Sequence, residues 1–232
     1  MTVINPANQS LRRAGLIAGV ALLTLAALAG YATIGIIGAL VTNGDAAKTA
    51  HDILASHALF RIGVGSLVLG AVLDVIIAWA LQIFFKPVHK NISTLAAIFR
   101  VTYAAIYVVA ISQLSAAVNL LTNLEYAKAY SVSQVHAEML QKIDSFDTIW
   151  QTGLIFFGIH LLLIGYLAYR STYVPKLVGI LLIIAGLGYL VDSFGTIIIT
   201  GYSADVGKFT FVGEAVLFIW LLLKGRKVTL TI

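Results

Sequence analysis

Cysteine is absent from this chain of 232 residues, and charged residues make up only 11% of it. The lack of thiols excludes disulfides, thiolate metal sites and cysteine nucleophiles. Soluble domains are about 45–50% apolar and about 25% charged. Here 60% of the residues are hydrophobic and the mean hydropathy is +0.97, which is more apolar surface than a soluble core of this size can bury. The composition therefore predicts a multi-pass protein of the cell (plasma) membrane, with the lipid bilayer as its main partner.

Six apolar segments are long enough to cross the hydrocarbon core of a bilayer, which is about 30 Å thick and takes roughly 20 helical residues. Their uninterrupted apolar runs favour helices, because the strands of a membrane barrel would alternate polar and apolar residues. We therefore predict an all-α integral membrane protein, a six-transmembrane-helix bundle that forms a single domain over residues 1–232. The predicted spans are residues 14–41, 59–85, 92–121, 148–169, 174–200 and 209–223.

The distribution of Lys and Arg predicts the orientation. If the N-terminus lies inside, nine cations and no acid lie at the inner edge, whereas five cations and seven acids lie at the outer edge. Cytoplasmic edges are enriched in Lys and Arg, so both termini are expected in the cytoplasm. The net charge of +5 then marks a membrane edge, and no nucleic-acid partner is expected. The nine inner cations are Arg12, Arg13, Lys86, Lys90, Arg170, Lys176, Lys224, Arg226 and Lys227.

Two outer connections have apolar residues at helical spacing and predict short amphipathic helices, which either cover the ends of the spans or lie along the outer interface. The apolar face of the first, opposite Lys48 and Asp52, would consist of Ala47, Ala50, Ile53, Leu54 and Ala58. The apolar face of the second would consist of Val132, Val135, Met139, Leu140 and Ile143.

Four ionisable residues on four different spans fall at one depth. Counting from the nearest inner cation at about 1.5 Å per residue places Asp74 about 18 Å, and Arg100, His160 and Glu214 about 15 Å, into the membrane. A charge in hydrocarbon costs about 2.5–3.5 kcal/mol, so such residues normally face the bundle interior and pair with one another. We predict that Arg100 is the centre, with Asp74 and Glu214 as candidate partners and His160 as a titratable neighbour.

Three further residues extend this predicted polar centre. Tyr103 and Tyr107 follow Arg100 by one and two turns on the same helical face, and Asp192 lies about 24 Å from the inner edge. Two acids and one Arg give the layer a formal charge of −1 unless a proton or a cation joins it. The layer is therefore predicted to bind a solute or relay protons, or else to fix helix register as a buried ion-pair network without another role.

The chain has no recognisable catalytic signature. It contains no GxSxG, HExxH or P-loop pattern, which disfavours an enzyme. One deep histidine with two acids from separate helices has no metal-binding motif, so neither a metal nor a cofactor is expected. Small residues such as Gly153 with Gly158, and Gly179 with Gly186, predict close helix packing.

Several sequence blocks, in order along almost the whole chain, resemble the family catalogued as domain of unknown function 4386. They are residues 53–63 (ILASHALFRIG), 86–88 (KPV), 157–166 (FGIHLLLIGY), 186–194 (GLGYLVDSF) and 213–214 (GE). This resemblance implies a bacterial or archaeal multi-pass membrane protein. It supplies no catalytic residues and no established activity.

Three hypotheses of function stay open. The first is a small carrier or pore component, proton-coupled through the polar centre, with a small molecule or an ion as ligand. The second is an intramembrane enzyme or a lipid-head-group binder, in which Arg100 would hold a phosphate or carboxylate and His160 or a carboxylate would act as general base. The third is a structural or sensory membrane subunit, and an oligomer is compatible with all three.

Overall fold

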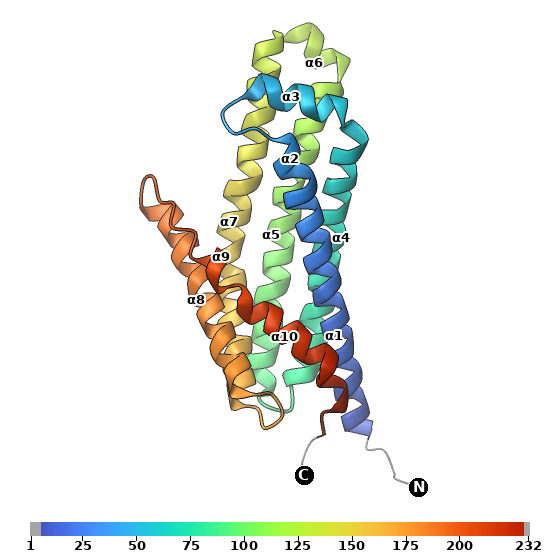
Figure 1. Ribbon diagram of the computed structural model, residues 1–232, viewed down its shortest axis with the longest axis vertical. Coiled ribbons are helices and arrows are strands. Elements are labelled where there is room, and N and C mark those ends of the chain that lie inside the picture. The colour runs from blue at the N-terminus through green and yellow to red at the C-terminus, as the bar shows by residue number, and fades with distance from the viewer. Residues whose placement is uncertain (1–5, 230–232) are drawn as a thin grey trace. The chain divides into compact units, whose positions relative to one another are not determined.

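The computed structural model describes residues 6–229, which form helices joined by short connections and contain no strand (Figure 1). The predicted all-helical fold is therefore confirmed. The extreme termini, which the sequence places in the cytoplasm, lie outside the described residues. So do the side chains of Pro6, Ala7, Leu124, Tyr126, Ala127, Lys208 and Arg226.

Five helical stretches are long and apolar enough to cross a membrane, and this agrees with the predicted class of membrane protein. The first, second, third and fifth lie close to the predicted spans, whereas the fourth begins 16 residues earlier than expected, at 132 instead of 148. The five are Asn8–Leu40, His57–Phe85, Lys90–Thr122, Val132–Arg170 and Lys176–Ile198.

The first stretch is not a uniform α-helix. It runs as α1 (Pro6–Gly30), continues through a π-helical segment η1 (Tyr31–Ile37) and ends in α2 (Gly38–Leu40). Within this stretch the Thr33 hydroxyl donates to the Ala29 carbonyl at 2.7 Å. Such π segments interrupt the regular hydrogen-bond ladder and occur mostly as single turns inside longer helices.

A short helix, α3 (Ala46–Ala55), forms where the first amphipathic helix was predicted, and α4 (His57–Phe85) follows it. Asp45 caps α3 by accepting the backbone N–H of Lys48. Lys48 and Asp52 form a salt bridge of 2.7 Å on its surface, and this hydrogen bond lowers the pKa of Asp52. The location of α3 at the outer interface stays a prediction.

The second separate amphipathic helix was a wrong prediction. After α5 (Lys90–Thr122) and α6 (Leu124–Ala129), residues 132–170 form one continuous helix, α7 (Val132–Arg170). Its start is fixed by a capping box, in which Gln134 Oε1 accepts the Ser131 N–H at 2.9 Å. No glycine or proline occurs between 132 and 152 to end it. At about 1.5 Å per residue, its 39 residues extend over about 58 Å, far more than one crossing requires.

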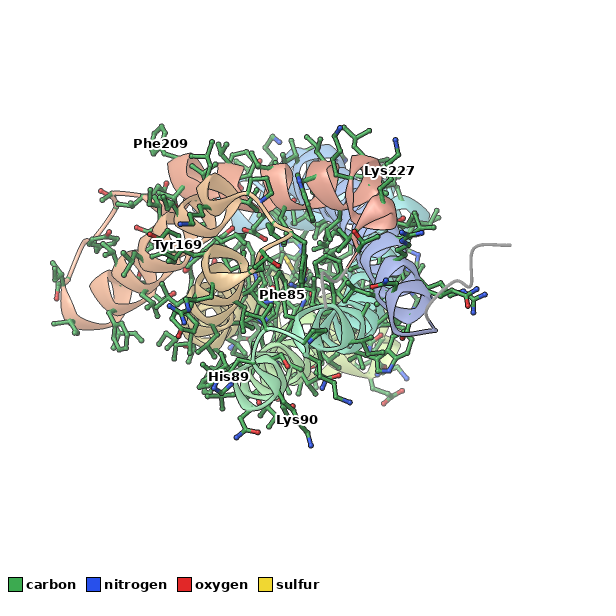
Figure 2. The ribbon with its side chains drawn as sticks, turned by 90° about the horizontal axis from the view of Figure 1, so that it is seen from below. Phe85, His89, Lys90, Tyr169, Phe209 and Lys227 are labelled. Carbon is green, nitrogen blue, oxygen red and sulfur yellow. The ribbon has the colours of Figure 1, made fainter. Side chains whose placement is uncertain are left out.

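The last predicted span, residues 209–223, is divided. After α8 (Lys176–Ile198) come the short α9 (Gly207–Thr210) and α10 (Val212–Leu223), and the chain ends in a 3-10 turn, η2 (Gly225–Lys227). The 12 residues of α10 cover about 18 Å, which is less than the hydrocarbon thickness of about 30 Å. Seen from below, the segment α9–α10 runs across the view between the labelled Phe209 and Lys227 (Figure 2).

The chain divides into two compact units. Unit 1 contains Met1–Thr24, Leu73–Ala104 and Gln151–Ile232, and unit 2 contains Leu25–Val72 and Ala105–Trp150. The boundaries fall inside α1, α4, α5 and α7, so each of these helices contributes to both units. The single domain expected from the sequence stays a prediction.

Unit 1 is built on close helix contacts at glycine. A Cβ added to Gly158 of α7 would lie 2.9 Å from the Gly186 carbonyl of α8, and one added to Gly165 would lie 2.8 Å from that of Gly179. The two helices are therefore antiparallel and in backbone contact, as small residues allow in membrane proteins.

The opposite face of α8 is apolar and exposed. Leu177 is 62% exposed and Ile198 is 74% exposed, and between them lie exposed apolar side chains at alternating spacings of three and four residues. A stripe of this spacing covers one helical face. Lipid is the solvent that suits such a face.

Unit 2 has its own apolar core, in which Ile36, Phe60, Leu67 and Leu114 are at most 1% exposed. Gly63 of α4 lets Ile36 of the π-helical segment approach, since an added Cβ would lie 3.2 Å from the Ile36 side chain.

Candidate functional site

An ion pair between α4 and α5 lies at the centre of unit 1. Nε of Arg100 donates to Oδ1 of Asp74 at 2.9 Å, and Nη2 donates to the same oxygen at 2.6 Å. Both residues are only 1% exposed. In so apolar an environment a charge is stable only when it is paired and hydrogen-bonded. The charge of Arg100 is therefore matched by Asp74.

His160 of α7 completes this cluster and is also 1% exposed. Its Nδ1 lies 2.8 Å from the Ala96 carbonyl, which can only accept, so Nδ1 carries the hydrogen and donates. Its Nε2 lies 3.2 Å from Nη1 of Arg100, which can only donate, so Nε2 accepts. His160 is thus a neutral imidazole whose two nitrogens are both occupied. A proton on Nε2 would set two donors against each other.

Aromatic rings cover the ion pair. The ring of Phe157, one turn before His160 on α7, lies 5.3 Å from the guanidinium carbon of Arg100. Tyr103 lies against Phe157 with a centroid distance of 4.9 Å, and Tyr189 of α8 meets Phe157 edge-on at 5.4 Å. A desolvated guanidinium over an aromatic face gains about 2 kcal/mol or more. The ring of Phe157 therefore stabilises the cation.

Glu214 of α10 has a different partner from the one predicted. Its Oε1 accepts the Tyr189 hydroxyl at 2.9 Å, and it forms no salt bridge with any described residue. Glu214 and Tyr189 are both half-buried. The predicted Arg100–Glu214 ion pair is absent among the residues that the structure describes. The contacts between these two residues are indirect: Glu214 binds the Tyr189 hydroxyl, the Tyr189 ring meets Phe157, and the Phe157 ring lies against Arg100.

Asp192 is separate from the cluster and organises the chain after α8. Its Oδ1 accepts the Tyr202 hydroxyl at 2.8 Å and the Val206 N–H at 2.9 Å, and its Oδ2 accepts the Gly207 N–H at 2.5 Å. These bonds hold the start of α9. The hydrogen bond to Asp192 raises the pKa of the Tyr202 hydroxyl.

Of the seven residues that the sequence singled out, the structure brings Asp74, Arg100 and His160 into direct contact. Tyr103 belongs to their aromatic cover. Tyr107 belongs to unit 2, where its ring lies 6.4 Å from Phe146.

Sequence reasoning missed Phe157 and Tyr189, which join the parts of the site. The signal for Phe157 was available, because residues three apart share a helical face and Phe157 precedes His160 by three. Tyr189 carried a similar signal, because it precedes Asp192 by three residues on α8. Its contacts with Phe157 and Glu214 carried no signal, since these partners lie on other helices.

The site offers two kinds of polar group. Arg100 supplies a fixed cation, and Glu214 supplies a carboxyl group bound to a neutral donor. Among the residues that the structure describes, no group of three His, Asp or Glu side chains gathers closely enough to hold a metal ion.

Comparisons with known proteins match most of the chain. The family model described as "Domain of unknown function (DUF4386)" matches residues 17–225. An uncharacterized protein of Archaeoglobus fulgidus is 37% identical over 158 residues, which are 68% of this chain and 80% of that protein. No solved structure matches. The family resemblance that the ordered sequence blocks predicted is confirmed.

Proposed function

This chain belongs to the DUF4386 family, and we propose that it is a small proton-coupled carrier or pore component in which Glu214 takes up and releases the proton. The observation that carries the proposal is the hydrogen bond from the Tyr189 hydroxyl to Glu214, made while Asp74 already neutralises Arg100.

The hydrogen bonds of the site single out Glu214 among its ionisable groups. Protonation of Asp74 would leave Arg100 without a counter-charge. Protonation of His160 would place a second N–H donor, on Nε2, against Nη1 of Arg100, which is itself a donor. Glu214 differs, because a phenol can donate both to a carboxylate and to the carbonyl oxygen of a carboxylic acid. Its proton can therefore come and go while the bond to Tyr189 persists.

The Arg100 cluster has a complementary role in this proposal. Asp74 and His160 hold the guanidinium in one position against the ring of Phe157, and that ring in turn contacts Tyr189, the hydrogen-bond partner of Glu214. Ionisable residues inside membrane bundles commonly mark the routes of solutes and protons.

Proton flux through proteoliposomes tests the proposal. Purified protein is reconstituted with a trapped pH-sensitive dye, and a potassium diffusion potential drives protons inward. The wild type is expected to acidify the vesicles faster than protein-free liposomes do. Glu214→Gln is expected to reduce the rate to that background, because an amide cannot exchange the proton, and Tyr189→Phe is expected to slow it.

Asp52→Asn is the matched control, since it removes a carboxylate on the surface of α3 and should keep the wild-type rate. A wild-type rate equal to that of protein-free liposomes contradicts the proposal. So does a Glu214→Gln variant that conducts as the wild type does.

We also propose six crossings with both termini in the cytoplasm. Nε of Arg12, near the start of α1, donates to the Val228 carbonyl at 2.9 Å, so the two ends of the described chain meet at one end of unit 1. Termini on the same side of a membrane require an even number of crossings. With five long helices, the segment from residue 199 to α10 makes the sixth, and Lys224 and Lys227 favour the cytoplasmic side.

Reporter fusions check this topology. A fusion after Thr229 is expected to fluoresce with green fluorescent protein and to stay inactive with alkaline phosphatase, which is active only outside the cytoplasm. Insertion at Gly44, in the turn before α3, should give the opposite result. Phosphatase activity after Thr229 would rule out six crossings with a cytoplasmic N-terminus.

A further inference from the structure

A cavity opens on unit 1 where the connection between α7 and α8 meets the end of α10. Its volume of about 610 Å³ is within the range of about 300–1,000 Å³ that is usual for ligand sites. Figure 2 looks onto this end of the unit, with Lys227 after α10 and Tyr169 near the end of α7. The residues on its wall include Thr172, Tyr173, Trp220, Lys224, Lys227 and Thr229, and no acid is among the described residues that line it.

We propose that this cavity binds a phosphate group, supplied by the headgroup of an anionic phospholipid. The site is distinct from the Glu214 centre and does not depend on proton transport, but it rests on the cytoplasmic location proposed above for this end of the chain. Basic pockets between membrane helices on the cytoplasmic side bind such headgroups. The two lysines supply the charge, and the threonines supply hydroxyl donors.

The aromatic part of the wall is held in place by the end of α4. The Tyr173 hydroxyl donates to the Phe84 carbonyl at 2.7 Å. The rings of Tyr173 and Trp220 both meet Phe84 edge-on, with centroid distances of 5.3 and 6.3 Å. Burial raises the pKa of Tyr173, so its hydroxyl stays protonated and keeps this bond. Tyr and Trp are the residues that favour the headgroup level of a bilayer.

The charge balance at the cavity favours an anion. The end of α10 contributes a partial negative charge of about one half, whereas Lys224 and Lys227 contribute two full positive charges. Arg12 adds a third cation behind the wall, where it holds the carbonyl of the lining residue Val228. Lys176 is left out of this balance, because its ammonium group lies over the ring of Tyr169 at 5.4 Å.

A lipid fits the surroundings better than free phosphate does. Ile219 and Leu223 of α10 are 49% and 60% exposed, and they lie four residues apart on one helical face that ends beside Lys224. This exposed apolar surface suits an acyl chain. Inorganic phosphate would make no use of it.

Thermal unfolding of the purified full chain in detergent tests the site. Phosphatidylglycerol is expected to raise the Tm, whereas phosphatidylcholine at the same concentration should not. In Lys224→Gln/Lys227→Gln the affinity for phosphatidylglycerol, measured by titration, should fall by roughly thirtyfold, since each lysine near an anionic lipid contributes about fivefold. Lys86→Gln/Lys90→Gln removes two lysines of the same edge outside the cavity and should keep the wild-type affinity.

Inorganic phosphate distinguishes the two sources of the anion. If it neither raises the Tm nor displaces phosphatidylglycerol at the lipid's working concentration, the lipid is supported as the ligand. If it does both, the assignment to lipid is overturned in favour of free phosphate. Equal losses in the two double variants, or equal stabilisation by phosphatidylcholine, would overturn the site itself.

Discussion

Asp74→Ala is expected to destabilise the protein by about 3–5 kcal/mol, because it leaves the guanidinium of Arg100 buried without its counter-charge. Arg100 is 1% exposed and cannot lose its proton to relieve the unpaired charge, so the free energy of unfolding falls. The measurement is thermal unfolding in detergent micelles, followed by circular dichroism.

The double variant Asp74→Ala/Arg100→Leu distinguishes the cost of an unpaired buried charge from the cost of losing the other contacts of Arg100. Removal of both charges should recover most of the stability, since apolar residues often replace a buried pair at little cost. The remaining loss should be about 1–3 kcal/mol, because Nε2 of His160 is left without its donor.

Asp52→Ala is the surface control. It breaks the exposed bridge to Lys48, and it should leave the Tm close to that of the wild type. A Tm for Asp74→Ala as high as that of Asp52→Ala would show that the buried pair does not stabilise the fold.

Gly213→Ala is expected to cost about 1–3 kcal/mol or more through overpacking between α10 and α8. A Cβ on Gly213 would meet the Leu181 carbonyl directly and would lie 3.0 Å from the Leu182 nitrogen. These are backbone atoms of α8, so the helices must move apart. Because Glu214 is the next residue, the same movement should weaken its bond to Tyr189 and lower proton flux.

Gly65→Ala, in α4, is the matched control. An added Cβ there has no neighbour within 4 Å, and alanine favours a helix over glycine by about 1 kcal/mol. This variant should unfold at or above the wild-type Tm. If Gly213→Ala were equally stable, close contact between α8 and α10 would be excluded.

Counting along the chain predicted one level for Asp74, Arg100 and His160, and the structure brings these three residues into contact. Depth along a helix is a one-dimensional quantity, since each residue advances the axis by about 1.5 Å. The cost of a charge in hydrocarbon then required these residues to meet. The same count put Glu214 at this level, yet the structure pairs it with Tyr189.

The sequence by itself determined that the chain is a helical membrane protein, where its four best-predicted spans lie and which charged residues must turn inward. Composition and apolar run length decide these properties, because the bilayer acts on each segment alone. The tertiary structure decided which carboxylate Arg100 takes, that Asp192 caps α9, and that α7 continues through a predicted break. These outcomes depend on the rotation and tilt of one helix against another, which packing at sites such as Gly186 and Gly213 sets.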